Sequence, residues 1–283
     1  MAQKQGQKLH CTEIIMYDDA MRDKVLRGET LKNSLPEAFL RDEILVYLQP
    51  KINSKTEEIV GAEALVRWLY HGNELMFPDK FIPYLEANNA ISILDEHVIK
   101  KVCQYFVKWK SEGKKLYPIS INLSQKEIKK ENFVSDIIKI VDQYDVDRAF
   151  IEFELTETAS FGDSEYFLKV ISQLKDEGFR ISIDDFGTGY SSFKMLKDMP
   201  INTLKIDKSF VDAISNGSNN IKGKMILEDV VNMTKHLDLD CVAEGVEEEH
   251  QKNMLRDWGC DYIQGYYYSK PIPCEEYENK YLQ

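Results

Sequence analysis

The sequence predicts an α/β fold in which eight strands alternate with helices and close into a barrel. Eight short β-rich runs follow residue 43, and amphipathic stretches separate most of them. This alternation is typical of parallel strands joined by crossover helices. A (β/α)8 barrel needs roughly 250 residues, and the chain has 283. An open doubly wound sheet would show the same local pattern, so closure is expected from the number of units.

The first two strands are expected to differ from the others. Ile44–Pro50 and Ile59–Arg67 flank Asn53–Glu58, which is polar and too short for a crossover. It predicts a hairpin turn and an antiparallel first pair. The other six strands are expected at Tyr117–Leu123, Ala149–Leu155, Arg180–Asp184, Thr203–Ile206, Cys241–Ala243 and Tyr262–Tyr267. The helices between them are expected at Asp95–Lys110, Gln125–Tyr144, Ser164–Glu177, Gly223–Leu237 and Glu247–Trp258.

The first 43 residues lie outside this alternation. Ala20–Arg27 and Leu31–Arg41 are expected to be helical, and Pro36 predicts a break or a helix start. The segment resembles the tail of a preceding domain followed by a connecting helix. The short stretch after Trp68 is expected to be a surface loop.

Charge and cysteine content exclude some kinds of partner and predict the cellular compartment. With 36 basic and 48 acidic residues, the net charge of −12 argues against a partner that is a nucleic-acid polymer or an anionic membrane. No apolar run reaches the roughly 18 residues of a membrane span, and the first residues lack the apolar core of a signal peptide. The five cysteines are odd in number and have no Cys-x-x-Cys spacing, which favours free thiols in a reducing cytoplasm. We therefore expect a cytoplasmic chain without membrane contact.

Polar side chains recur where the expected strands end. They are Glu63, Asn122, Glu154, Asp184, Asp185, Lys205, Glu244 and Gln264. In a barrel these ends meet at one rim, where such folds place their active sites. The side-chain period of two puts Asn122, Glu154 and Asp184 opposite the apolar face of their strands. One such acid could simply cap a helix, but recurrence at one strand end after another favours a shared site.

The candidate metal ligands in this set offer only oxygen atoms; they are Glu63, Asn122, Glu154, Asp184, Asp185 and Glu244. Carboxylates that crowd together raise one another's pKa or need a cation, and oxygen-only ligation suits Mg²⁺ or Mn²⁺. The adjacent Asp184 and Asp185 suit two ions, which in turn suit displacement at phosphorus. Lys205 could orient the attacking water or offset phosphate charge.

The glycine-rich stretch Asp185–Ser192 opens a helix, and its glycines allow close approach to an anion. Its Asp-Phe-Gly triplet also occurs in protein kinases. The kinase interpretation fails because no His-Arg-Asp catalytic loop and no Gly-x-Gly-x-x-Gly strand pair accompany it.

A family resemblance emerges from these motifs together. The run Glu63-Ala64-Leu65-Val66-Arg67-Trp68 resembles the signature of EAL domains, the cyclic di-GMP phosphodiesterases. The resemblance extends from about Leu40 to Pro273. It includes Tyr47-Leu48-Gln49-Pro50, Phe81-Ile82-Pro83, Asn122-Leu123-Ser124, Glu154-Leu155-Thr156-Glu157, Asp184–Ser192, Lys205-Ile206-Asp207, Ala243–Glu247 and Gln264-Gly265.

The resemblance implies a TIM-like (β/α)8 barrel with an antiparallel first strand, and hydrolysis of 3′,5′-cyclic di-GMP to linear pGpG. It implies two Mg²⁺ or Mn²⁺ ions, with Ca²⁺ expected to inhibit. One ion would be held by Glu63, Asn122, Glu154 and Asp184, and the other by Asp184, Asp185 and Glu244. Among the catalytic residues Glu63, Asp185, Lys205 and Glu244, the lysine would contact the nucleophilic water.

The resemblance also implies further roles. Substrate contacts would come from Gln49, Leu65, Arg67, Asp207 and Gln264. Support of the loop and of a homodimer formed through Asp185–Ser192 would come from Glu157, Phe186, Gly187, Thr188, Gly189 and Glu247. Residues 1–30 resemble the end of a GGDEF domain, so we expect residues 31–283 to be the phosphodiesterase half of a GGDEF–EAL protein.

Two other functions stay open at this point. One is a receptor that binds cyclic di-GMP without hydrolysing it, although the intact set of acids weighs against it. The other is an enolase-type barrel that abstracts a proton with strand-end acids and a lysine. The Asp184-Asp185 doublet and the glycine-rich loop are not needed for that chemistry.

Overall fold

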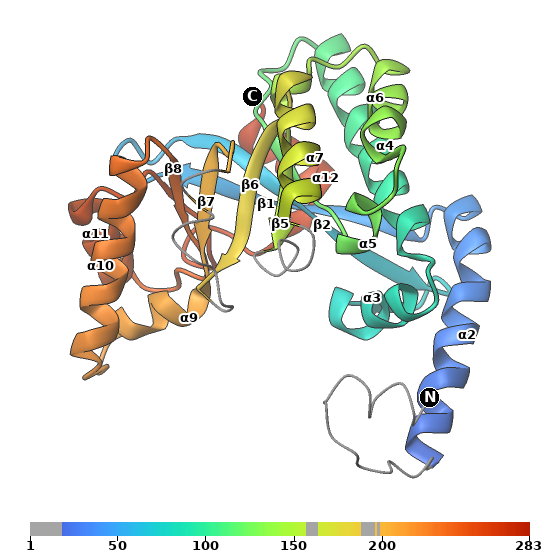
Figure 1. Cartoon of the computed structure of the whole chain (residues 1–283), viewed down its shortest axis with the longest axis horizontal. Coiled ribbons are helices and arrows are strands. Elements are labelled where there is room, and N and C mark those ends of the chain that lie inside the picture. Colours follow the sequence, from blue (N-terminus) through green and yellow to red (C-terminus); the bar gives the residue numbers. More distant parts are fainter. Residues whose placement is uncertain (1–18, 157–163, 188–195, 197–198) are drawn as a thin grey trace. The chain divides into compact units, whose positions relative to one another are not determined.

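The computed structural model describes residues 19–156, 164–187, 196 and 199–283 (Figure 1). These residues divide into two units. The smaller unit comprises the described part of Met1–Leu45 with Arg67–Ile91, and the larger comprises Val46–Val66 with the described part of Ser92–Gln283. Within the described ranges, no helix combines the length and the apolar character needed to cross a bilayer.

Eight strands of the described chain form a closed ring, which confirms the predicted barrel. They are β1 (Ile44–Asn53), β2 (Ile59–Tyr70), β4 (Ile119–Asn122), β5 (Ile151–Thr156), β6 (Arg180–Phe186), β7 (Thr203–Ile206), β8 (Asp240–Ala243) and β9 (Tyr262–Ile263). From β2 to β9, each strand pairs in parallel with the next. Strand β1 closes the ring, because it pairs with β2 and runs antiparallel to β9.

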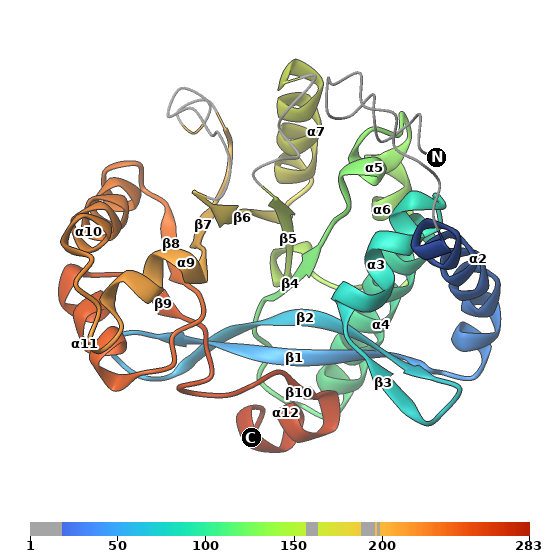
Figure 2. The ribbon, with the colours of Figure 1, turned by 90° about the horizontal axis from the view of Figure 1, so that it is seen from below.

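The predicted hairpin between the first two strands is present (Figure 2). The amide of Asn53 donates to the carbonyl of Glu58 at 2.9 Å. The Asn53 side chain also accepts from the amides of Lys55 and Thr56, which fixes the start of the turn. Glu57 takes the left-handed conformation, with φ of 59°. The reversed direction of β1 thus follows from a turn too short for any crossover.

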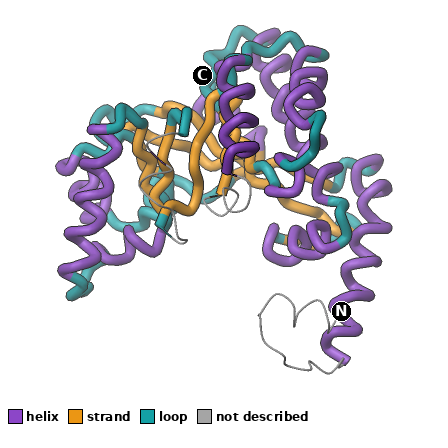
Figure 3. The backbone as a smooth tube through the Cα atoms, viewed as in Figure 1, coloured by secondary structure: helices purple, strands orange, loops and turns teal. Residues whose placement is uncertain are grey.

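The helices of the larger unit cover the outer face of the strands (Figure 3). They are α4 (Ile91–Ser111), α5 (Gln125–Ile128), α6 (Phe133–Asp142), α7 (Ser164–Asp176), α9 (Lys208–Val211), α10 (Ile221–His236), α11 (Glu249–Trp258) and α12 (Cys274–Tyr281). Helix α7 packs on β6 and α10 packs on β8. Outward side chains such as Ile151, Phe153 and Ile181 are fully buried beneath such helices. The inward face of the same strands is therefore left for polar groups.

Two element predictions in the larger unit were wrong in extent. The single helix expected at Gln125–Tyr144 is two helices, α5 and α6, because four polar residues from Lys129 to Asn132 interrupt the apolar repeat. The strand expected at Tyr262–Tyr267 ends at Ile263. There the amide of Gln264 bonds the carbonyl of Ala243 and the chain leaves the ladder.

The smaller unit corrects two further expectations. Helix α2 (Asp19–Leu40) continues through Pro36, since Leu31, Leu35 and Ala38 form one buried stripe that outweighs the lost backbone bond. The stretch after Trp68 is not a loop throughout, because β2 continues to Tyr70 and pairs with β3 (Glu74–Met76). Helix α3 (Pro78–Ala87) follows, and its Phe81 ring packs edge-on against Trp68 at 5.6 Å.

Short elements complete the larger unit. They are the 3₁₀ turns η1 (Arg148–Phe150) and η3 (Asp212–Ile214) and the strand β10 (Ile272–Pro273). Strand β10 pairs antiparallel with β1, at Leu48 opposite Ile272. The last helix, α12, is held by Glu278, which accepts from Lys108 at 2.7 Å, from the indole of Trp109 at 3.0 Å and from Lys114.

Replacing Glu278 by glutamine should destabilise the fold by about 1–3 kcal/mol at neutral pH, because the buried indole of Trp109 loses a charged acceptor. The hydrogen bonds to its cationic partners overcome partial burial and lower the pKa of Glu278 to about 2. An acid with a lowered pKa stabilises the fold above its unfolded pKa and loses this effect as the pH falls toward 2. Urea unfolding should therefore show a wild-type advantage that shrinks below about pH 4.5. Glu276→Gln, at an exposed position on α12, is the control. An equal loss of stability in this control would show that Glu278 has no special role in holding α12.

Candidate active site

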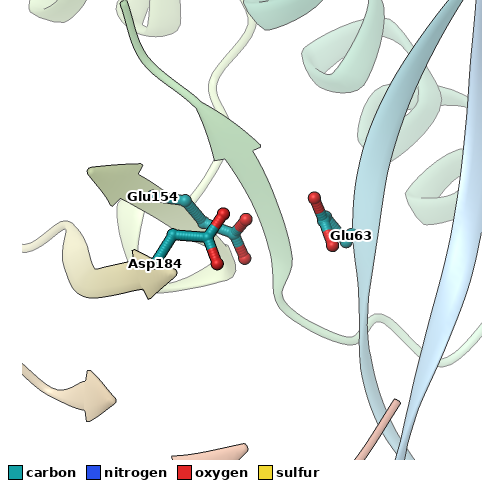
Figure 4. Close-up of side chains that lie close together, drawn as sticks. All are labelled: Glu63, Glu154 and Asp184. Atoms are coloured by element: carbon teal, nitrogen blue, oxygen red, sulfur yellow. The ribbon is translucent and has the colours of Figure 1, made fainter. Parts of the chain in front are cut away.

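Four carboxylates surround the side chain of Lys205 inside the barrel mouth. Its Nζ lies 2.7 Å from Glu154 Oε2, 3.0 Å from Asp184 Oδ1 and 2.6 Å from Glu244 Oε1. A fourth contact, to Glu63 Oε2, measures 3.4 Å. Figure 4 shows the carboxylates of Glu154 and Asp184 side by side, with that of Glu63 facing them from β2. One ammonium group therefore contacts acids on three different strands and the acid that directly follows a fourth strand.

A bulge in β6 explains how two consecutive aspartates serve one site. Ile183 pairs with Leu204 and Phe186 with Ile206, so two residues of β6 stand opposite one residue of β7. Asp185 has φ of 55°, in the left-handed region that aspartate tolerates better than most residues. Successive side chains of a regular strand point to opposite faces, and a bulge re-aims one of them. The bulge thus brings Asp185 to the same side as Asp184.

The acids form two overlapping triads that fit divalent cations. In Glu63, Glu154 and Asp184, and again in Asp184, Asp185 and Glu244, one oxygen from each carboxylate lies within 4.8 Å of the others. Asn122 donates its amide nitrogen to Glu63 at 2.8 Å, which leaves its carbonyl oxygen for a metal. This all-oxygen donor set can bind metal, and it suits hard ions.

Glu154 is the most strongly stabilised anion of the set. Its side chain is fully buried, which would raise its pKa, but Lys205 on one oxygen and Lys51 on the other lower it to about 2. The distance from Lys51 Nζ to Glu154 Oε1 is 3.1 Å. Glu154 therefore stays ionised without any added cation.

The other acids shift in the opposite direction. Burial and the charge of Glu154 raise the pKa of Glu63, and burial also raises the pKa of Asp184 and Glu244 despite their contact with Lys205. The pKa of Asp185 is raised by burial and by Asp207. The pKa of Lys205 rises well above its usual value, because these acids outweigh its own burial. The site thus holds more negative charge than one lysine can balance, which favours cation binding.

Two glutamines extend the site toward the seam between β1 and β9. Gln264 donates to Glu63 Oε2 at 2.5 Å and to Gln49 at 3.2 Å, and Gln49 donates to the carbonyl of Ser269 at 3.1 Å. The Oε1 atom of Gln264 is buried and has no donor among the described residues. The next residue is glycine for a steric reason, since a Cβ on Gly265 would lie 2.1 Å from the carbonyl oxygen of Val246.

Several other predicted residues have partners of their own. Asp207 caps α9 by accepting from the amide of Ser209 at 3.0 Å, and half-buried Leu65 is two residues beyond Glu63 on β2. Glu247 pairs with Lys208 at 2.9 Å. Arg67 belongs to the smaller unit, where its guanidinium lies 5.1 Å from the ring centroid of Phe77.

The glycine-rich loop is described only at its start. Phe186 is buried, and Gly187 has φ of 95° with the Phe210 ring where a Cβ would be. Three predicted residues, Glu157, Thr188 and Gly189, lie outside the described ranges.

The sequence prediction missed Lys51 and Glu152, which are both buried inside the barrel. Lys51 Nζ lies 2.9 Å from Glu152 Oε1. The period of two offers a signal for both, because Lys51 shares a strand face with Gln49, and Glu152 shares one with Glu154.

Comparisons with known proteins agree with this geometry. The EAL domain family model matches residues 32–271. Signaling protein YkoW of Bacillus subtilis is 36% identical over 86% of this chain. MucR of Pseudomonas aeruginosa, a bifunctional diguanylate cyclase and cyclic di-GMP phosphodiesterase, is 30% identical over 97% of it. A solved structure of the MucR phosphodiesterase in complex with c-di-GMP superposes with a TM-score of 0.81 at 32% identity, covering 87% of this chain and 99% of that one.

The chain spans 30% of the length of YkoW and 39% of MucR. The family match, in contrast, covers most of the chain and includes both carboxylate triads and the whole ring of strands. This chain belongs to the EAL domain family.

Proposed function

We propose that this chain hydrolyses 3′,5′-cyclic di-GMP to linear pGpG in a reaction that requires divalent cations. The observation that carries the proposal is the pair of carboxylate triads that share Asp184. Family membership and the MucR complex with c-di-GMP support the choice of substrate. In this reaction a water oxygen bonds to phosphorus, the P–O3′ bond breaks, and the released 3′ oxygen takes up a proton.

Six side chains would hold two Mg²⁺ or Mn²⁺ ions. Glu63, Asn122, Glu154 and Asp184 would bind one, and Asp184, Asp185 and Glu244 the other. When bound, two such ions activate water and offset the charge of the phosphate in a displacement at phosphorus. Asp184 would belong to both ion sites.

The remaining groups position the reactants. Lys205 has three N–H donors at the centre of the acids, and one of them would hold the attacking water once the acids bind metal. The amides of Gln49 and Gln264 lie beside Glu63 and can hydrogen-bond the substrate or an ordered water. Leu65, Arg67 and Asp207 are proposed as further substrate contacts.

Incubation of the chain with cyclic di-GMP and Mg²⁺ or Mn²⁺, followed by chromatographic separation, tests the proposal. We expect pGpG with either ion and none after chelation. Ca²⁺ should inhibit, because its longer bonds and flexible coordination misplace the reacting groups. Tight binding of cyclic di-GMP without any pGpG in either metal would instead identify a receptor.

We also propose that the chain follows a GGDEF-like domain, acts in the cytoplasm and forms a homodimer. The match to MucR covers 97% of the chain and so extends into the first 30 residues, which supports a preceding GGDEF-like domain. The described cysteines Cys103, Cys241, Cys260 and Cys274 are free thiols, which supports action in the cytoplasm. A homodimer formed through Asp185–Ser192 is proposed from the family resemblance, with Glu157, Phe186–Gly189 and Glu247 supporting that loop.

A further inference from the structure

A chain of ion pairs crosses the interior of the barrel beneath the catalytic acids. Arg180 Nε lies 3.3 Å from Glu152 Oε2, and Glu152 Oε1 lies 2.9 Å from Lys51 Nζ. Lys51 then contacts Glu154 Oε1 at 3.1 Å, and Glu154 Oε2 contacts Lys205 at 2.7 Å. These ion pairs thus connect the opposite end of the strands with the proposed metal ligands.

Each residue in this series of ion pairs is fixed by more than one partner. Glu152 also accepts from the hydroxyl of Thr203 at 3.0 Å, and Arg180 also pairs with Asp240 at 2.7 Å. A cavity of about 150 Å³ at this end is lined by Lys51, Glu152, Arg180 and Asp240 among others. Since Lys51 is only 6% exposed, its ammonium is held in place by Glu152 on one side and Glu154 on the other.

The two oxygens of Glu154 are thereby assigned to different partners. Lys51 takes Oε1, from below, and Oε2 faces Lys205 and the other acids. A carboxylate bound through one oxygen cannot rotate freely, so the other oxygen keeps its direction. Groups that orient a metal ligand typically change metal affinity or activity by roughly 10–100-fold when they are replaced.

We propose that Lys51 is a positioning residue, which holds Glu154 in the orientation that binds the metal ion without itself contacting metal or substrate. The inference rests on the proposed function, because it takes Glu154 to be a metal ligand. Glu152 has the subordinate role of holding Lys51.

Mn²⁺ titration of the chain without nucleotide, followed by calorimetry or by electron paramagnetic resonance of the free ion, tests this directly. Lys51→Met should weaken Mn²⁺ binding by roughly 10–100-fold. The matched control is Lys252→Met, since Lys252 is also buried and pairs with Glu57 at 2.7 Å, but contacts none of the acids of the site. Unchanged Mn²⁺ affinity in Lys51→Met would overturn the proposal.

A double variant separates positioning from a purely structural role, and it guards against misfolding. Lys51→Met leaves Glu152 with one cation fewer, whereas Lys51→Met with Glu152→Gln removes both charges of the buried pair. If Lys51 positions Glu154, the double variant should still bind Mn²⁺ weakly. If Lys51 only balances Glu152, the double variant should regain wild-type affinity, which would refute the proposal. Failure of the proposed function would show elsewhere, as a wild-type chain that binds Mn²⁺ but releases no pGpG.

Discussion

Replacement of Glu63 by glutamine should lower the turnover of cyclic di-GMP by at least about a thousandfold, well beyond the roughly 10–100-fold expected for residues behind the ligands. The substitution keeps the volume but removes an anion that accepts from Asn122 at 2.8 Å and from Gln264 at 2.5 Å. In either orientation of the new amide, its NH₂ group faces one of these two donors, and that hydrogen bond is lost. Product formation under saturating Mn²⁺ measures the loss.

The same variant should not be less stable than the wild-type chain when metal is absent. Burial and the neighbouring charge of Glu154 raise the pKa of Glu63, so the ionised form is unfavourable in the metal-free fold. Thermal unfolding in a chelator should therefore show an equal or higher midpoint for Glu63→Gln, whereas added Mn²⁺ should stabilise the wild type more than the variant. Glu275→Gln, at an exposed position on α12, is the matched control. Full turnover by Glu63→Gln would remove Glu63 from the proposed ligand set.

Replacement of Lys205 by methionine should destabilise the metal-free chain by about 3–5 kcal/mol, as expected when one partner of a buried ion pair is removed. The side chain is 1% exposed and contacts four carboxylates, and the loss leaves three of them without any other cation within 4 Å among the described contacts. Turnover should also fall by about a thousandfold, because both water orientation and charge balance are lost. Urea unfolding and product assays measure the two effects.

The pH dependence of this variant follows from its unpaired acids. Their pKa values in the fold rise further above those of the unfolded chain, so the folded state binds more protons and stability increases as the pH falls toward the unfolded carboxyl pKa of about 4. Saturating Mn²⁺ should restore much of the lost stability at neutral pH. Lys208→Met is the control, because Lys208 lies near the same rim but is largely exposed. A metal-free Lys205→Met chain as stable as the wild type would show that the acids do not depend on this ammonium.

Sequence periodicity predicts the barrel and its acid-lined mouth well, because both depend on repeated local patterns. Alternation along short strands separates Asn122, Glu154 and Asp184 from the apolar face, and a turn too short for a crossover predicts the reversed first strand. Helix boundaries depend on tertiary packing instead. The apolar stripe around Leu35 carries α2 through Pro36, which local rules treat as a break.

The detailed site depends on geometry that residue types do not encode. A period of two would send Asp185 away from Asp184, and only the bulge in β6 reverses this. Lys51 was missed for a related reason. A lysine in a strand is usually exposed, and its burial here depends on Glu152, a residue 101 positions away.

The seam between β1 and β9, which closes the ring, determines when during folding the site can form. It joins Ile52 of β1 to Ile263 of β9, and the hydrogen bond from Gln49 to the carbonyl of Ser269 spans 220 positions. Contacts so distant in sequence carry a large loop-closure entropy and form late. Since Gln264 reaches Glu63 only across this seam, a chain still emerging from the ribosome has its acids but not their final arrangement, and it becomes competent only when its last strand is added.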